Sequence, residues 1–356
     1  MRFIRKYRHY ITAIVAIIFI AGMFMYFNKI NSIRNNNVKS EIFAGNAMGT
    51  VIKKTIYTEN QAINTTIDKQ IDDVIKALDD QISVRYADSE IAKCNRNYAA
   101  NGVYNLSSNI VEYLRQEMQI YEETDGAFSP CVRPLTNLWG IEDGYTIVPD
   151  MSDIKMIVED INADNIQIVD DGIIFKETDM AIDFGAVGKG IACDEVAKVL
   201  ATTQAQGAVV SIGGSILAYG DKGDGQDWHI GIQDPRATEG EMLGIVDVES
   251  NMIISTSGDY EKYFELEGRR YHHILDPRTG YPSNNGLISV TIISDNGFLS
   301  DALSTACFVL GLEDGMKYAI EKGVEAIFVT KDKEVYITKG LEKTFRLQAD
   351  GYTIVK

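Results

Sequence analysis

Residues 181–200 read AIDFGAVGKGIACDEVAKVL, and this stretch decides how the chain is organised. It begins with a glycine-rich turn and predicts a helix over residues 188–200. Glycines let the backbone approach a ligand closely, a helix start favours a phosphate, and Lys189 adds a positive charge. The stretch matches neither GxGxxG nor the Walker sequence GxxxxGKS/T, so a generic nucleotide loop is not assigned.

The segments on either side of this stretch predict a mixture of helices and strands. Before it we expect a strand over 50–58, helices over 67–82, 108–123 and 154–161, and strands over 166–169 and 172–175. After it we expect strands over 208–219, 228–233, 243–248, 253–257, 260–266 and 287–294, helices over 300–310 and 313–321, and strands over 326–330 and 334–338. Hairpin-like runs mixed with helices predict an α+β fold, and no long linker divides residues 41–356.

Charge separates the first forty residues from the rest of the chain. The formal net charge is −17, yet residues 1–40 hold seven basic and no acidic residues, so the remainder carries −24. Such an acidic body is a poor partner for nucleic acid or for an anionic membrane face.

An uncharged run over residues 10–27, YITAIVAIIFIAGMFMYF, predicts a membrane anchor. As a helix it would span about 27 Å, enough to cross a bilayer. Residues 1–9 carry most of the flanking basic charge, which predicts a cytoplasmic N-terminus, a polar tether over 28–40 and an extracytoplasmic domain over 41–356. The expected protein is therefore a single-pass protein of the cell membrane. A cleavable signal peptide is the alternative, although the run exceeds a usual h-region and no small-x-small site follows it.

The four cysteines, at positions 94, 131, 193 and 307, are far apart and form no CxxC pair. Zinc binding by cysteine spacing is therefore not expected. So few cysteines in so large a domain predict buried free thiols, with disulfides as the alternative outside the cell.

Two further clusters carry chemistry. Residues 271–282, YHHILDPRTGYP, contain adjacent histidines, and neighbours in a strand point to opposite faces, so at most one of them serves a given site. At the start of the helix predicted over 300–310, Asp301 and Thr305 are four residues apart and share one face. A carboxylate beside a hydroxyl offers the oxygen donors that suit Mg²⁺.

Eight motifs in order resemble the ApbE family of flavin transferases, the FAD:protein FMN transferases. They are AMGT at 47–50, Ser83 with SEI at 89–91, TDGAFS at 124–129 with PL at 134–135 and LWG at 138–140, DFGAVGKG at 183–190, SIGG at 211–214, STSGDY at 255–260, HILDPRTG at 273–280 and DALST at 301–305. The resemblance implies a T-fold-like α+β architecture, with FAD between two closely joined subdomains.

The resemblance also implies roles for individual residues. Residues expected to line the flavin or adenine pocket are Met48, Ala127, Phe128 and Ser129, and those expected to contact FAD are Asp183, Lys189 and Leu275. Residues expected to hold Mg²⁺ are Ala186 through its carbonyl, Asp301, Thr305 and Ser304. Two positions depart from the family pattern: Ser129 replaces a common Asp, and Arg85 stands where an aromatic residue is common, with Tyr86 one place on.

The implied reaction splits the FAD pyrophosphate, moves FMN to a Ser or Thr hydroxyl of an acceptor redox protein and releases AMP. The acceptor motif associated with the family is an Asp-Gly pair followed by small residues and a Ser or Thr. Catalytic roles are expected for Asp301 with Mg²⁺, for Lys189 as an electrostatic aid and for His273 as the base. Two alternatives stay open: a Mg²⁺-dependent FAD pyrophosphatase that makes FMN and AMP, and a flavin-binding protein without turnover.

Overall fold

The computed structural model describes residues 38–355. The predicted cytoplasmic segment over 1–9, the membrane anchor over 10–27 and most of the tether lie outside the described residues. Within residues 38–355, no helix is both long and apolar enough to cross a membrane.

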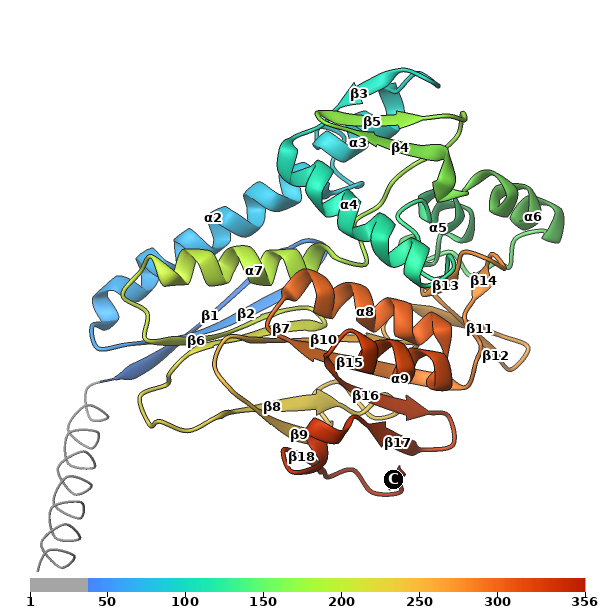
Figure 1. Cartoon of the computed structure of the whole chain (residues 1–356). Coiled ribbons are helices and arrows are strands. Elements are labelled where there is room, and N and C mark those ends of the chain that lie inside the picture. The colour runs from blue at the N-terminus through green and yellow to red at the C-terminus, as the bar shows by residue number, and fades with distance from the viewer. Residues whose placement is uncertain (1–37, 356) are drawn as a thin grey trace, which may run out of the picture.

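A nine-stranded sheet is the centre of the fold (Figure 1). Its order is β1 (Lys39–Ala47), β2 (Thr50–Thr58), β6 (Gly207–Ile212), β7 (Ser215–Gly220), β10 (Met252–Gly258), β15 (Leu287–Ser294), β16 (Glu325–Thr330), β17 (Glu334–Ile337) and β19 (Thr353–Val355). All neighbours pair antiparallel except β17 with β19. All eight residues of β15 are buried, as expected for a central strand that is covered on both faces.

Helices cover one face of this sheet, and a second sheet covers part of the other (Figure 1). The covering helices are α2 (Asn64–Ile82), α7 (Gly188–Ala201), α8 (Gly297–Leu310) and α9 (Leu312–Glu321). The second sheet has the order β18 (Phe345–Leu347), β9 (Met242–Val248) and β8 (Trp228–Gln233). A separate apolar core joins the two sheets, with Trp228 and Val246 packed together with Ile254 of β10.

The upper part of Figure 1 is built mainly from residues between α2 and α7. It contains α3 (Glu90–Asn97), α4 (Ser108–Glu123), α5 (Arg133–Trp139), α6 (Met151–Asp160) and a three-stranded sheet of β3 (Val103–Asn105), β5 (Gly172–Phe175) and β4 (Ile166–Val169). Two short hairpins complete the fold, β11 (Tyr263–Leu266) with β12 (Arg269–His272) and β13 (Leu275–Asp276) with β14 (Tyr281–Pro282). The main core continues from this part into the helices over the large sheet, so the two parts are closely joined.

The structure confirms the α+β class and most of the predicted elements, with four corrections. The strand predicted over 208–219 is two strands, because Gly213 takes a left-handed φ of 56° and turns the chain back. The strand predicted over 260–266 begins only at Tyr263. The tether predicted to residue 40 ends earlier, because Lys39 and Ser40 pair with β2. Helices α3 and α5 and seven strands were not predicted; the strands are β1, β3, β12, β13, β14, β18 and β19. All four cysteines are buried and free, as expected.

Glu117 on α4 is fully buried, and neither of its carboxyl oxygens has a hydrogen-bond partner among residues 38–355. Burial raises its pKa well above the ordinary 4.5, and the negative charge of Asp183 adds to this effect. The folded chain therefore holds this proton to a higher pH than the unfolded chain does. Stability from this group is present below about pH 4.5 and falls as the pH rises.

We expect Glu117→Gln to stabilise the protein by about 1–3 kcal/mol at pH 8, with a smaller gain at pH 5, since the amide stays neutral at both. The free energy of unfolding, measured by urea denaturation at the two pH values, tests this. Glu112→Gln is the matched control, because Glu112 is an exposed carboxylate on the same helix. A Glu117→Gln variant that is less stable than the wild type at pH 8 would contradict the expectation.

Candidate active site

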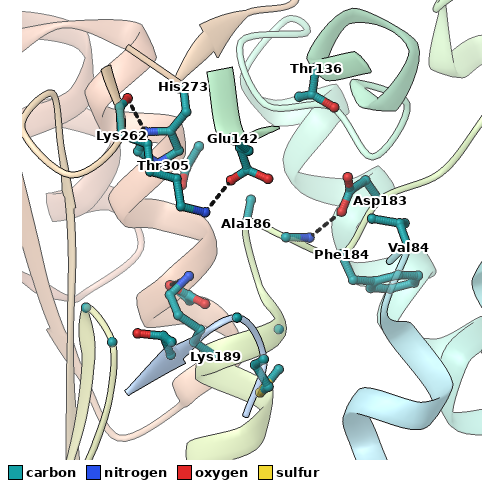
Figure 2. Close-up of a pocket in the computed structure, with 18 of the residues that line it drawn as sticks. Val84, Thr136, Glu142, Asp183, Phe184, Ala186, Lys189, Lys262, His273 and Thr305 are labelled. Carbon is teal, nitrogen blue, oxygen red and sulfur yellow. Dashed lines mark hydrogen bonds and ion pairs between the residues drawn. The ribbon is translucent and has the colours of Figure 1, made fainter. Parts of the chain in front are cut away.

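A cavity of about 360 Å³ lies where the upper part of the molecule meets the large sheet and its helices. Its walls come from the loop after α2, the turn before α7, the β6–β7 turn, the end of β10, the segment before β13 and the first turns of α8. Figure 2 shows the side chains that point into it. The volume falls within the range of small-molecule sites in proteins.

Asp301 and Lys189 form one corner of this cavity. The Asp301 carboxylate accepts hydrogen bonds from the Gly190 backbone N–H at 2.9 Å and from the Ser215 hydroxyl at 3.2 Å. The Lys189 ammonium lies 3.8 Å from Asp301 Oδ1, and this carboxylate raises the pKa of Lys189. Asp301 is 4% exposed, so its remaining free surface faces the cavity that it lines. The corner therefore presents a fixed carboxylate and a firmly protonated amine.

Three of the four residues expected to hold Mg²⁺ line the cavity, and Thr305 follows Asp301 by one turn of α8. Ala186, Asp301 and Thr305 all line the cavity. Ser304 is fully buried and does not line it; its hydroxyl donates to the backbone carbonyl of Asp301 at 2.8 Å. Ser257 lies 2.7 Å from the Ser304 hydroxyl and 3.1 Å from that of Thr305, and so supports both.

The donor chemistry of this corner fits Mg²⁺. No cluster of three or more His, Cys, Asp or Glu side chains suited to a metal occurs among residues 38–355. Mg²⁺ does not need such a cage, because it is commonly held by one or two carboxylates together with water and substrate phosphates. Asp301, the Thr305 hydroxyl and a backbone carbonyl are hard oxygen donors of this kind.

His273 lines the cavity, whereas His272 does not. His272 is buried and contacts the Ser283 carbonyl through Nε2 at 2.9 Å. His273 Nδ1 lies 3.3 Å from the Lys262 carbonyl, and because a carbonyl only accepts, Nδ1 carries the hydrogen and Nε2 keeps a free lone pair. Burial lowers the pKa of His273 to about 4, despite the opposing charge of Glu142. The imidazole is therefore neutral at pH 7 and able to accept a proton.

Asp183 lies on the other side of the cavity in the view of Figure 2. Its carboxylate accepts from the Gly185 backbone N–H at 2.8 Å and lies 3.5 Å from the Arg133 guanidinium. Burial raises the pKa of Asp183, and Arg133 acts against that rise. This carboxylate is thus a fixed acceptor for a polar ligand group.

Of the other predicted ligand residues, Met48, Ser129 and Leu275 line the cavity. Ala127 and Phe128 do not: they are 1% and 2% exposed and belong to the main apolar core. The sequence run that contains them is thus divided, and only Ser129 reaches the cavity. Met48 takes a left-handed φ of 52°, and its N–H donates to Asp79 at 3.0 Å, so the backbone of this turn is held in place.

Glu142, Glu261 and Lys262 also line the cavity, although sequence reasoning did not single them out as site residues. Lys262 and Glu142 meet at 2.7 Å, and Arg85 reaches the second oxygen of Glu142 at 3.0 Å. Glu142 is separated from Arg85 by 57 positions and from Lys262 by 120, so no local sequence pattern connects them.

The fold and the cavity define the class of the protein: an α+β protein with a candidate ligand site where two closely joined parts meet. The model of the ApbE family matches residues 48–328. A protein of Klebsiella pneumoniae named FAD:protein FMN transferase is 30% identical over 312 residues, covering 86% of this chain and 95% of its own. A protein of Treponema pallidum with the same name is 30% identical over 319 residues, covering 84% and 87%.

Two solved structures agree. The flavinyl transferase ApbE of Pseudomonas stutzeri, in its apo form, superposes with a TM-score of 0.76 at 30% identity, covering 88% of this chain and 98% of its own. The ApbE protein of Thermotoga maritima gives 0.77 at 29% identity, covering 86% and 100%. The chain belongs to the ApbE family, and it is a transferase.

Proposed function

We propose that this protein transfers FMN from FAD to a Ser or Thr hydroxyl of an acceptor redox protein and releases AMP, with Mg²⁺ as its cofactor. The observation that carries the proposal is the meeting, in one cavity, of the Asp301, Thr305 and Lys189 corner with a neutral His273. The relatives named FAD:protein FMN transferase support the substrate and the transferred group.

In the proposed step, the acceptor hydroxyl oxygen forms a bond to the FMN phosphorus, and the bond from that phosphorus to the bridging oxygen breaks. AMP leaves with the bridging oxygen. His273 Nε2 accepts the hydroxyl proton, and its Nδ1 hydrogen bond to the Lys262 carbonyl keeps the ring oriented. Lys189 stabilises negative charge on the phosphates through its ammonium.

Asp301, Thr305 and the Ala186 carbonyl would hold Mg²⁺, which supplies positive charge to the pyrophosphate and to the departing AMP. Lys189 alone offers one positive charge against the two negative charges of a pyrophosphate. Because the domain carries a strong excess of acidic residues, a further cation at this corner favours binding of the anionic substrate.

The proposal can be tested with the full chain in detergent. The chain is incubated with FAD, Mg²⁺ and candidate redox proteins that carry an Asp-Gly motif with a Ser or Thr. Fluorescent flavin that stays on the acceptor in a denaturing gel, with one AMP released per label, is the expected result. AMP and FMN without labelled protein identify a pyrophosphatase instead. FAD binding without either product identifies a binding protein.

Replacing His273 with alanine is expected to slow transfer by about 10²–10⁴-fold, the usual contribution of a general base. FAD affinity should change little, because the ring is assigned to proton transfer. Single-turnover rates measure the effect on transfer, and fluorescence quenching measures the effect on FAD affinity. His229→Ala is the control, since His229 is exposed on β8 and pairs with Asp247. A His273→Ala variant as fast as the wild type rules out the base.

We further propose that the chain is held in the cell membrane by residues 10–27, with residues 41–356 on the outer side. The support is the uncharged run and the basic residues that precede it. Protease added to intact cells should remove the C-terminal domain and leave a cytoplasmic control protein intact. A protease-resistant domain, or a domain that is recovered without the membrane fraction, contradicts this topology.

A further inference from the structure

Glu142 places a carboxylate inside the cavity between two cations. It lies on a three-residue turn (Ile141–Asp143) after α5, and its side chain is 30% exposed. One oxygen accepts from Lys262 Nζ at 2.7 Å, and the other accepts from the Arg85 guanidinium at 3.0 Å. In the view of Figure 2, Glu142 stands between His273 and Asp183. The carboxylate therefore forms part of the wall of the candidate ligand cavity.

The two cations come from different parts of the molecule. Arg85 follows α2, and Lys262 lies between β10 and β11. Within residues 38–355, Glu142 is the carboxylate that lies within ion-pair distance of each of them. Burial acts to raise the pKa of Glu142, but the charge and hydrogen bond of Lys262, with smaller effects of His273 and of the Arg85 hydrogen bond, lower it to about 2. Each oxygen of this ionised carboxylate accepts from one cationic donor, as two oxygens of a bound phosphate would.

We propose that Arg85 and Lys262 form an oxyanion subsite of the cavity, that Glu142 fills it with its own carboxylate, and that phosphate groups of the nucleotide substrate replace this carboxylate when they bind. The inference rests on the proposed function for the identity of the nucleotide. It adds a second phosphate-binding element to the Asp301 and Lys189 corner, built from residues that lie far apart in the chain.

The geometry allows such an exchange. The Glu142 turn is bounded by Gly140 and Gly144, which both take left-handed φ angles, so the residue is carried by a short loop and not by a long helix. The Glu142 side chain is 30% exposed, so rotation about its bonds can carry the carboxylate away from the two cations. In the exchange, a phosphate oxygen takes the place of the Glu142 carboxylate beside Arg85 and Lys262. Both cations therefore still face a negative charge after the ligand binds.

The test uses the full chain and measures binding by calorimetry, first of inorganic pyrophosphate without metal and then of FAD with Mg²⁺. Glu142→Gln keeps the shape of the side chain and frees the two cations, so pyrophosphate should bind about tenfold more tightly. Asp143→Asn is the matched control, because Asp143 is an exposed carboxylate on the same turn as Glu142 and does not line the cavity. It should change the affinity less than about threefold.

Lys262→Gln should weaken pyrophosphate binding about tenfold. In the double variant, the increase in pyrophosphate affinity caused by Glu142→Gln should be much smaller than the increase that Glu142→Gln causes in the wild type. Unchanged or weaker pyrophosphate binding by a folded Glu142→Gln protein overturns the proposal. Glu142 then has a structural role and does not occupy an anion-binding subsite. If Glu142→Gln does not fold, unchanged binding by Lys262→Gln overturns it. A wild type that binds pyrophosphate but not FAD contradicts the proposed function and leaves the subsite standing.

Discussion

Replacing Asp301 with alanine is expected to lower Mg²⁺-dependent AMP release by on the order of a thousandfold or more, the largest effect of any single change in the cavity. Asp301 is the carboxylate of the proposed metal corner, and it also accepts from the Gly190 N–H and the Ser215 hydroxyl. Its removal takes away the metal ligand and the anionic partner of Lys189 together. AMP release at increasing Mg²⁺ concentrations measures the loss.

Two further variants make the Asp301 result specific. Asp301→Asn keeps the size and most hydrogen bonds, so a similar loss in this variant assigns the effect to the charge. Asp295→Ala is the control, because Asp295 is an exposed carboxylate just before α8 and should leave the rate unchanged. Full activity of Asp301→Ala would exclude this residue from the metal site.

Replacing Gly190 with alanine is expected to destabilise the protein by about 2–5 kcal/mol and to reduce activity further than the stability loss explains. A Cβ atom at Gly190 would overlap the carbonyl oxygen of Gly297 and lie 2.7 Å from the Asp301 Cβ. The backbones of α7 and α8 thus meet where neither can carry a side chain. Separating them moves Lys189 and Asp301 apart, since each helix carries one of these residues in its first turns.

Thermal unfolding and FAD binding of the Gly190→Ala protein test this, with Gly45→Ala as the control. Gly45 lies in β1, and a Cβ there would meet nothing within 4 Å. A Gly190→Ala protein with the stability and Mg²⁺-dependent activity of the wild type would show that the two helices can separate freely, which contradicts the close contact.

The elements predicted from the sequence are those whose burial pattern follows a local period. The predicted helix over 108–123 coincides with α4, and apolar spacing placed α2 within three residues of its start. Helix α5 was missed because it has seven residues, too few for a pattern to repeat. Strands β6 and β7 were merged because both are apolar, and only the left-handed turn at Gly213 separates them.

The sequence by itself determined the α+β class, the order of the family motifs and the residue types available for oxygen-donor chemistry, because local periods and short motifs are properties of neighbouring residues. Only the tertiary structure decided which of those residues share the cavity. It placed Ala127 and Phe128 in the core, left Ser304 behind the cavity wall and brought Arg85, Glu142 and Lys262 together. Contacts between distant residues depend on how helices and strands pack. That packing is set by the burial of many side chains from all parts of the chain, so no single stretch of sequence determines it.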